Sequence, residues 1–177
     1  MGKRNRLFNE ANVLPDNLEL NDEFVGTFNL IENTNDSIFI TGKAGTGKST
    51  LLKYFKKNTA KNVAVLAPTG VAAVNIGGQT IHSFFRFPPR LIQKDNIRRR
   101  RNSEIIQKLD TVIVDEVSMV RADLMDGIDY ALRINRDEMK LPFGGVQMVF
   151  FGDLFQLPPV VEKEARDILD QRYDSPY

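Results

Sequence analysis

Residues 41–50 read T-G-K-A-G-T-G-K-S-T, and this stretch decides the fold. It matches the phosphate-loop pattern G-x-x-x-x-G-K-[ST] from Gly42 to Ser49 without a mismatch. A short apolar run at 38–40 precedes it, and apolar residues at helical spacing follow it. The alternative is a chance glycine turn before a helix, and both flanks argue against it. We therefore predict a phosphate-binding loop between a buried strand and a helix.

The residue types of this loop suit a nucleoside triphosphate. Glycine lets the backbone wrap around phosphate oxygens where a Cβ would intrude, and the loop amides offer positive partial charge to an anion. Lys48 adds a full charge for the β- and γ-phosphates, and the Ser49 hydroxyl is suited to bind Mg²⁺. The predicted ATP-binding residues are Gly42, Ala44, Gly45, Thr46, Gly47, Lys48, Ser49 and Thr50.

Length and composition favour one globular domain. The chain has 177 residues, of which 42% are hydrophobic and 27% charged, which is ordinary for a domain with a substantial core. The absence of cysteine excludes disulfide bonds, thiolate metal sites and a cysteine nucleophile. No apolar run approaches membrane-spanning length, so no membrane partner is expected. Residues 1–20 are polar and weakly patterned, and we predict a loose arm there, followed by a domain over 21–177.

Positive charge is concentrated in residues 86–101, although the net charge of the whole chain is only +1. Seven basic residues and one acid give this segment a local charge of +6 and leave −5 for the rest of the chain. Two interpretations remain open. The segment could follow a nucleic-acid phosphate backbone, in which case binding would weaken with salt, or it could be a solvated mobile loop.

Four apolar runs alternate with helical patterns along the chain. The runs cover 38–40, 63–67, 112–114 and 146–151, and the helical patterns cover 48–57, about 70–76 and 122–135. The runs show little polar alternation, which is typical of strands covered on both faces. The sequence therefore predicts an α/β fold with a mostly parallel sheet and helices on both faces. Because ligands bind beyond the carboxyl ends of such strands, we expect the four following loops to converge there.

The third run ends in two acids, Asp115 and Glu116. Asp115 is suited to hold Mg²⁺, and Glu116 is placed to polarise the water that attacks a γ-phosphate. A protein that only binds nucleotide does not need the second acid, so the pair favours hydrolysis; the alternative is an acidic pair that caps the next helix. Gln156 follows the fourth run and could contact the γ-phosphate, but its residue type alone favours an ordinary loop glutamine, with Pro158 and Pro159 making the loop rigid.

Two further segments suit single-stranded nucleic acid. They read P-T-G-V-A-A (68–73) and G-G-Q-T-I-H-S-F-F (77–85), and they combine backbone amides, hydroxyls, an imidazole and adjacent aromatic rings. Phosphates accept hydrogen bonds from the first two groups, and each base stacked on a ring is worth about 1–3 kcal/mol. A phenylalanine pair is more often core, so we expect either Phe84 or Phe85 to be buried, and a single histidine such as His82 is more often structural.

In this order, the motifs resemble the Pif-one family of superfamily 1 DNA helicases, related to RecD. The resemblance extends from about residue 20 to residue 177 and rests on the segments at 41–50, 67–73, 77–85, 114–119 and 142–160. Residues 118–133, S-M-V-R-A-D-L-M-D-G-I-D-Y-A-L-R, also resemble that family's own signature segment. The resemblance implies a RecA-like P-loop NTPase domain that uses ATP and Mg²⁺. Without it, a P-loop ATPase of another kind, such as an AAA-type remodeller, or a nucleotide-dependent DNA-binding module remains open.

The resemblance also implies a role for each site residue. The catalytic residues implied are Lys48, Glu116 and Gln156, and the Mg²⁺ ligands implied are Ser49 and Asp115. The single-stranded DNA track implied consists of Thr69, Val71, Thr80, His82 and Phe85. Members of the family move 5′ to 3′ on DNA, unwind duplexes and forks, and serve DNA repair, recombination and telomere maintenance. The implied partners are single-stranded DNA and DNA junctions, and the implied location is the nucleoid-associated cytoplasm of a bacterium or the nucleus or mitochondrion of a eukaryote.

Two features depart from the family pattern. The context L-N-D-E-F puts Phe24 where the family usually has a glutamine that reads adenine, which puts adenine selectivity in doubt. The second RecA-like domain, with the arginine that completes the ATP site, is not among residues 1–177. We expect a monomer that hydrolyses ATP slowly and does not unwind DNA by itself, because an arginine finger is worth about 10³–10⁵ in rate.

Overall fold

The computed structural model describes residues 21–43, 45–101, 103–156, 158–159, 161 and 163–173. Within these residues five parallel strands form one sheet in the order β1-β5-β4-β2-β3. The strands are β1 (Ile38–Thr41), β2 (Val63–Ala67), β3 (Gln79–Thr80), β4 (Thr111–Val114) and β5 (Gln147–Gly152). The predicted fold class is therefore confirmed. The predicted arm at 1–20 lies outside the described residues.

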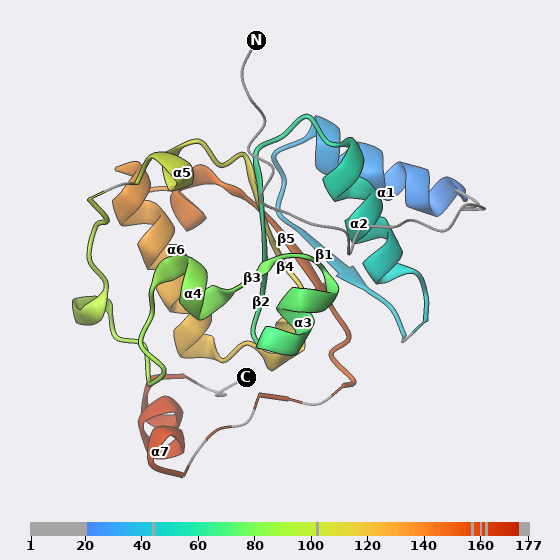
Figure 1. Ribbon diagram of the computed structural model, residues 1–177. Coiled ribbons are helices and arrows are strands. Elements are labelled where there is room, and N and C mark those ends of the chain that lie inside the picture. Colours follow the sequence, from blue (N-terminus) through green and yellow to red (C-terminus); the bar gives the residue numbers. More distant parts are fainter. Residues whose placement is uncertain are drawn as a thin grey trace.

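Helices cover both faces of the sheet, as Figure 1 shows, with α1 and α2 on one side and α4 and α6 on the other. Helix α1 begins at Asp22 because Asn21 Oδ1 accepts a hydrogen bond from the Phe24 amide at 2.8 Å. The α-helices are α1 (Asp22–Asn33), α2 (Lys48–Asn58), α3 (Gly70–Asn75), α4 (Ile81–Phe85), α5 (Glu104–Gln107), α6 (Ala122–Arg136) and α7 (Lys163–Arg172). The 3₁₀ turns are η1 (Lys94–Asn96), η2 (Val117–Met119) and η3 (Pro142–Gly145). None of the helices described is both long and apolar enough to cross a membrane.

The central strands divide their side chains between two apolar cores. In β4, Val112 and Val114 join the core under α4 and α6, whereas Ile113 joins the core under α1 and α2. All three side chains are 0% exposed, and full burial of such a side chain is worth about 1.5–3 kcal/mol. This two-sided burial explains why the strands are apolar throughout and why their carboxyl ends lie at one edge.

The basic segment 86–101 is fastened to the domain. Ile92 and Ile97 are 4% and 7% exposed and belong to the core beside α6. The Ile92 amide donates to Asp123 Oδ2 at 2.8 Å, and the Arg100 amide donates to Asn135 Oδ1 at 2.9 Å. Buried side chains and contacts with α6 therefore anchor the backbone of this segment at Ile92, Ile97 and Arg100, which argues against a loop that is solvated throughout.

The last residue of α6, Arg136, holds two other segments together. Its Nη1 lies 3.0 Å from the carbonyl of Ile106 at the end of α5, and it also reaches the carbonyls of Gln107 and Leu109 at 2.9 and 3.0 Å. Its Nε donates to the carbonyl of Gly144 in η3 at 2.9 Å. One guanidinium therefore donates to carbonyl oxygens both where α5 ends and where β5 is about to begin.

Replacing Arg136 with leucine is expected to lower the free energy of unfolding by about 3 kcal/mol, because each buried acceptor left unpaired costs about 1–3 kcal/mol. The melting temperature should fall by about 6–12 °C for a chain of this size. Urea and thermal unfolding followed by circular dichroism measure both quantities. Arg99→Leu is the control, since Arg99 pairs with Asp137 on the surface and its loss is expected to cost less than about 1 kcal/mol. Equal losses in the two variants would contradict the role of Arg136.

Candidate functional site

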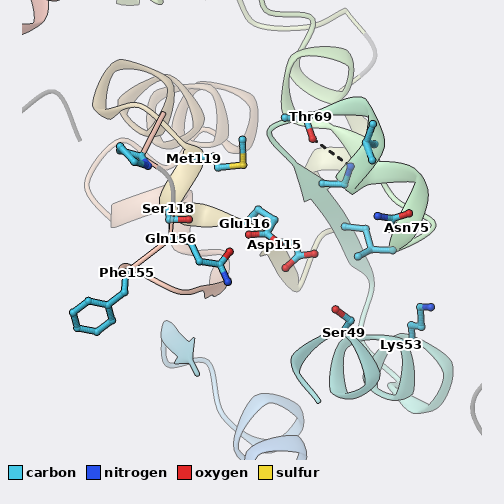
Figure 2. A pocket seen from close by; sticks show the side chains of 14 residues that line it. Ser49, Lys53, Thr69, Asn75, Asp115, Glu116, Ser118, Met119, Phe155 and Gln156 are labelled. Carbon is cyan, nitrogen blue, oxygen red and sulfur yellow. Dashed lines mark hydrogen bonds between the residues drawn. The ribbon is translucent and has the colours of Figure 1, made fainter. Parts of the chain in front are cut away.

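A cavity of about 1010 Å³ lies beyond the carboxyl ends of the strands. Its lining includes residues from each of the four loops that we expected to converge: Ser49, Thr69, the pair Asp115 and Glu116, and Gln156. Figure 2 shows Asp115 and Glu116 in the middle, between Ser49 on α2 and Gln156 beyond β5, with Phe155 turned away. The parallel sheet thus brings four segments that are distant in sequence to one site.

Glycine is required at several points of the phosphate loop. Gly45 and Gly47 have φ angles of 84° and 87°, which a residue with a Cβ rarely adopts, and Gly47 caps the start of α2. A Cβ on Gly42 would lie 2.7 Å from Thr46 Oγ1, which itself donates to the Lys43 carbonyl at 2.9 Å. The loop can therefore close tightly before α2. Ala44, also predicted to bind ATP, lies outside the described residues.

The ammonium of Lys48 is held inside this loop. Its Nζ donates to the carbonyl of Gly42 and, at 3.0 Å, to that of Lys43. Lys48 is the first residue of α2, so its charge adds to the positive end of the helix. Loop and helix together thus present an anion site, in the strand–loop–helix context that the sequence predicted.

Asp115 continues the strand ladder into the cavity. Its amide donates to the Leu66 carbonyl at 2.9 Å, which fixes the carboxylate at the end of β4. Burial raises the pKa of Asp115, the charge of Glu116 raises it further, and a hydrogen bond from the Glu116 amide and the charge of Lys48 oppose the rise. The carboxylate therefore sits where a cation would relieve its desolvation.

The donor set fits Mg²⁺ bound together with a nucleotide. No group of three or more histidine or acidic ligands occurs among the described residues, so no metal cage made of protein alone is present there. Magnesium is usually held by one or two carboxylates, substrate phosphates and water. Ser49 and Asp115 line the same cavity and supply a hydroxyl and a carboxylate. Ser118 also lines the cavity, and its Oγ is buried without a hydrogen-bond partner among the described residues.

Glu116 has an unusual backbone conformation. Its φ and ψ angles are 50° and 44°, the left-handed region that costs a residue other than glycine about 1–3 kcal/mol. The turn η2 that follows packs against the end of β5, where a Cβ on Gly152 would lie 2.8 Å from Val117 Cγ1. Packing against Gly152 therefore helps to keep the strained residue, and with it the carboxylate, at the cavity.

Gln156 is positioned by an aspartate that sequence reasoning missed. Asp153 is 9% exposed, and its carboxylate accepts a hydrogen bond from the Phe155 amide at 3.0 Å. The Gln156 amide donates to the Asp153 carbonyl at 3.0 Å, and its side-chain Nε2 lies 3.4 Å from Asp153 Oδ2. The signal was present, since aspartate commonly organises the turn that follows it. Other lining residues without a sequence signal are Lys53, Asn75, Met119 and Phe155.

The two threonines predicted to contact DNA cap short helices. Thr69 Oγ1 accepts a hydrogen bond from the Ala72 amide at 3.2 Å at the start of α3, and Thr80 Oγ1 accepts one from the Ser83 amide at 3.1 Å at the start of α4. Each hydroxyl still has its own hydrogen to donate. Val71 is 75% exposed on α3. Thr69 and Val71 also line the cavity, so this part of the predicted track adjoins the nucleotide site.

His82 and Phe85, both predicted to contact DNA, differ in how far their side chains are exposed. His82 is partly buried, and its pKa is lowered by burial and then by the charge of Arg121, with Asp123 opposing, so the neutral imidazole is favoured. Phe85 is only 6% exposed and stacks on Phe87, with ring centroids 5.2 Å apart. The placement of Phe85 on the DNA track is therefore corrected, because its ring belongs to the core. The expectation that one of the two adjacent phenylalanines is buried is confirmed.

Phe24, which stands where the family usually has an adenine-reading glutamine, packs on α2. Its ring meets that of Tyr54 edge-on at a centroid distance of 5.3 Å. This contact is typical of aromatic packing between two helices. Phe24 therefore has a packing role between α1 and α2, and it supplies no amide to read a base.

Replacing Asp115 with asparagine is expected to raise the melting temperature at neutral pH without Mg²⁺ or nucleotide. Because burial raises the pKa of Asp115 in the folded state, its charge opposes folding above that raised pKa. The advantage of the asparagine variant should shrink as the pH falls through the raised pKa, because the wild-type carboxyl then becomes neutral. Thermal unfolding at several pH values measures this. Asp95→Asn, at an exposed position, is the control, and a variant no more stable than wild type would contradict a desolvated carboxylate.

A family model and curated sequences match most of the chain. Residues 19–172 match the model of the PIF1-like helicase family. The ATP-dependent DNA helicase PIF1 of Saccharomyces cerevisiae (strain YJM789) is 42% identical over 83% of this chain and 18% of its own length. The ATP-dependent DNA helicase Pif1 of Bdellovibrio bacteriovorus is 36% identical over 85% of this chain and 35% of its own length. The chain therefore spans about a fifth of the length of the first relative and about a third of the length of the second.

Solved structures match the fold as well as the sequence. A Pif1 helicase from Bacteroides in complex with ADP-AlF3 and single-stranded DNA has a TM-score of 0.81 and 44% identity, over 91% of this chain and 38% of that one. A structure described as the basis for unwinding at forked duplex DNA by two coordinating Pif1 helicases has a TM-score of 0.81 and 46% identity, over 89% of this chain and 39% of that one. At this identity, the likeness covers the arrangement of the motifs as well as the fold.

Proposed function

The chain belongs to the PIF1-like helicase family, and from that premise we propose that residues 21–177 are the first motor domain of an ATP-dependent, 5′-to-3′ DNA helicase. The observation that carries the proposal is that Ser49, Asp115, Glu116 and Gln156 all line one cavity. These residues supply a hydroxyl, two carboxylates and a neutral amide, the groups that ATP hydrolysis at a phosphate loop requires.

In the proposed reaction, each group acts on a different part of ATP. Lys48 moves its ammonium from the loop carbonyls to the β- and γ-phosphates. Ser49 and Asp115 would hold Mg²⁺, which would supply positive charge to the phosphates. Glu116 accepts a proton from the attacking water, and Gln156 contacts the γ-phosphate. An arginine from a second motor domain completes the charge stabilisation.

Single-stranded DNA is the proposed second substrate. It crosses the starts of α3 and α4, where Thr69, Thr80 and backbone amides face its phosphates and Val71 and His82 adjoin its sugars and bases. Because Thr69 and Val71 also line the nucleotide cavity, a change at the γ-phosphate has a short path to the DNA. The related Bacteroides Pif1 structure with ADP-AlF3 and single-stranded DNA supports the pairing of these two ligands.

The remaining proposals concern partners and location. We propose that DNA junctions are the physiological substrates and that a second motor domain is the obligatory partner. We also propose that the protein acts as a monomer. The protein then acts wherever DNA is held: in the nucleoid-associated cytoplasm of a bacterium, or in the nucleus or mitochondrion of a eukaryote. DNA repair, recombination and telomere maintenance are the processes that such an activity serves.

The deciding experiment measures ATP hydrolysis with and without oligothymidylate, and strand separation of duplexes carrying a 5′ or a 3′ tail. We expect DNA to stimulate hydrolysis and, when the second motor domain is present, only 5′-tailed duplexes to be unwound. Fast hydrolysis that ignores DNA would instead favour an ATPase of the AAA type. Binding of DNA and nucleotide with no hydrolysis in either form would favour a non-enzymatic binding module.

A further inference from the structure

Two neighbouring hollows beside α4 share two arginines. The first has a volume of about 390 Å³, the second about 740 Å³, and Arg86 and Arg100 line both. We call the joined hollows the arginine groove. Its basic residues are Lys56, Arg86, Arg98, Arg99, Arg100 and Arg101, and no acidic residue is among the described residues that line it.

The groove is built on a fixed base. Phe85, Phe87 and Ile97 line its first hollow, and all three are buried in the core. The Arg100 amide donates to Asn135 Oδ1 at 2.9 Å, and Arg100 Nη1 donates to the Phe84 carbonyl at 2.9 Å. The position of Arg100 is therefore set by the rest of the domain, which reduces the entropy that this side chain loses when a ligand binds.

The arginines fall into two sets. Arg99 forms two hydrogen bonds with the carboxylate of Asp137, at 2.5 and 2.6 Å, so its charge is already compensated. In contrast, Arg86, Arg98 and Arg101 are exposed and form no ion pair within the described part of the chain. Burial lowers the pKa of Arg100, and the nearby charge of Arg86 lowers it further, so these cations repel each other. An anion bound between them would relieve that repulsion.

We propose that the arginine groove binds consecutive phosphates of DNA, as a surface additional to the track at the starts of α3 and α4. Helix α4 joins the two, since His82 belongs to the proposed track and Ser83 and Phe84 line the groove. Its five residues span only about 7 Å at 1.5 Å per residue, so one strand can reach both surfaces. This inference rests on the proposed function, because DNA is the ligand in both.

The test is the salt dependence of DNA binding in the full chain. The triple variant Arg86→Ala, Arg98→Ala, Arg101→Ala removes the uncompensated charges, and Lys57→Ala, Lys108→Ala, Lys140→Ala removes three equal charges from exposed positions outside the groove. Between about 50 and about 200 mM salt, three phosphate contacts account for about a 20- to 40-fold loss of affinity, which the groove variant should no longer show. The lysine control should keep the wild-type slope.

Fluorescence anisotropy with labelled single-stranded, duplex and forked DNA identifies which DNA supplies the phosphates. A reduced slope with any of them supports the groove, and the DNA that shows it is its ligand. A variant in which the three arginines become lysine should keep most of the slope, which separates lost charge from lost folding. An unchanged slope in the alanine variant overturns the proposal. Poly-glutamate that binds wild type but not the alanine variant, while DNA binds both with the same slope, also overturns the proposal, because the groove would then bind an acidic peptide.

Failure of the groove is distinguishable from failure of the proposed function. Stimulation of ATP hydrolysis by DNA in the wild-type protein reports the function without reference to the groove. If stimulation is present and the slope is unchanged, only the groove is wrong. If stimulation is absent and the slope still falls in the alanine variant, the groove stands and the motor function is wrong.

Discussion

Replacing Glu116 with glutamine is expected to slow ATP hydrolysis by about 10²–10⁴-fold, the contribution typical of a general base. Glutamine keeps the length and shape of the side chain at the cavity but cannot accept a proton from water. Nucleotide affinity should stay close to that of wild type, because the phosphates are bound by the loop and Lys48. Single-turnover hydrolysis with the protein in excess measures the first quantity, and titration with a fluorescent ATP analogue measures the second.

Glu104→Gln is the matched control, because Glu104 is an exposed acid on α5 that does not line the cavity. It should leave both hydrolysis and affinity unchanged. Equal losses of affinity and hydrolysis in Glu116→Gln would mean that Glu116 supports the fold of the turn at the cavity. Undiminished hydrolysis would mean that another group takes the proton from water.

Replacing Lys48 with alanine should reduce hydrolysis by about 10²–10³-fold, as expected when one donor to the developing charge is lost from a preorganised site. ATP affinity should fall as well, since in the proposed reaction the ammonium contacts the phosphates both before and during hydrolysis. A second measurement follows from linkage: ligand at about 100 times its Kd stabilises a protein by about 2.7 kcal/mol. Mg²⁺–ATP should therefore raise the melting temperature of wild type and have little effect on the variant.

The control for this change is Lys57→Ala, at an exposed position in the last turn of the same helix. It removes an equal charge from α2 at the end away from the loop. Lys48→Ala also leaves the carbonyls of Gly42 and Lys43 without their hydrogen bonds from Lys48. The melting temperatures of wild type and variant without ligand must therefore be compared first. A folded Lys48→Ala protein with normal turnover would exclude the proposed nucleotide site.

The sheet was largely predictable because its strands are buried on both faces. The runs at 63–67 and 112–114 are continuously apolar, and they correspond to β2 and β4 to within one residue. Strand β3 was missed because two residues carry no periodic signal. The resemblance placed Phe85 on the DNA track, and helix α4, with only five residues, is too short for its sequence pattern to show that this side chain faces the core.

The parts of the candidate site that are contiguous in sequence were predictable, whereas the parts that depend on packing were not. The phosphate loop and the acid pair are contiguous motifs, and the parallel sheet determines that they meet. Ser118 could not be predicted, because the burial of its hydroxyl follows only from the folded chain. Asp153 was predictable in principle, because its contact with the Phe155 amide is a local turn contact. In the basic segment, the sequence shows the positive charge directly. It does not show that Ile92 and Ile97 anchor the segment, because two isolated isoleucines among polar and basic residues form no periodic pattern.

Because the backbone of Glu116 is left-handed, selection for folding and selection for catalysis should favour different residues at this position. Glycine, asparagine and aspartate adopt this conformation more readily than glutamate. A library randomised at residue 116 and selected only for solubility should therefore become rich in these three, whereas selection for ATP turnover should return glutamate. ATP turnover would therefore require the residue with the higher backbone strain, and a protein with one of these three residues at position 116 should be stable but should not turn ATP over.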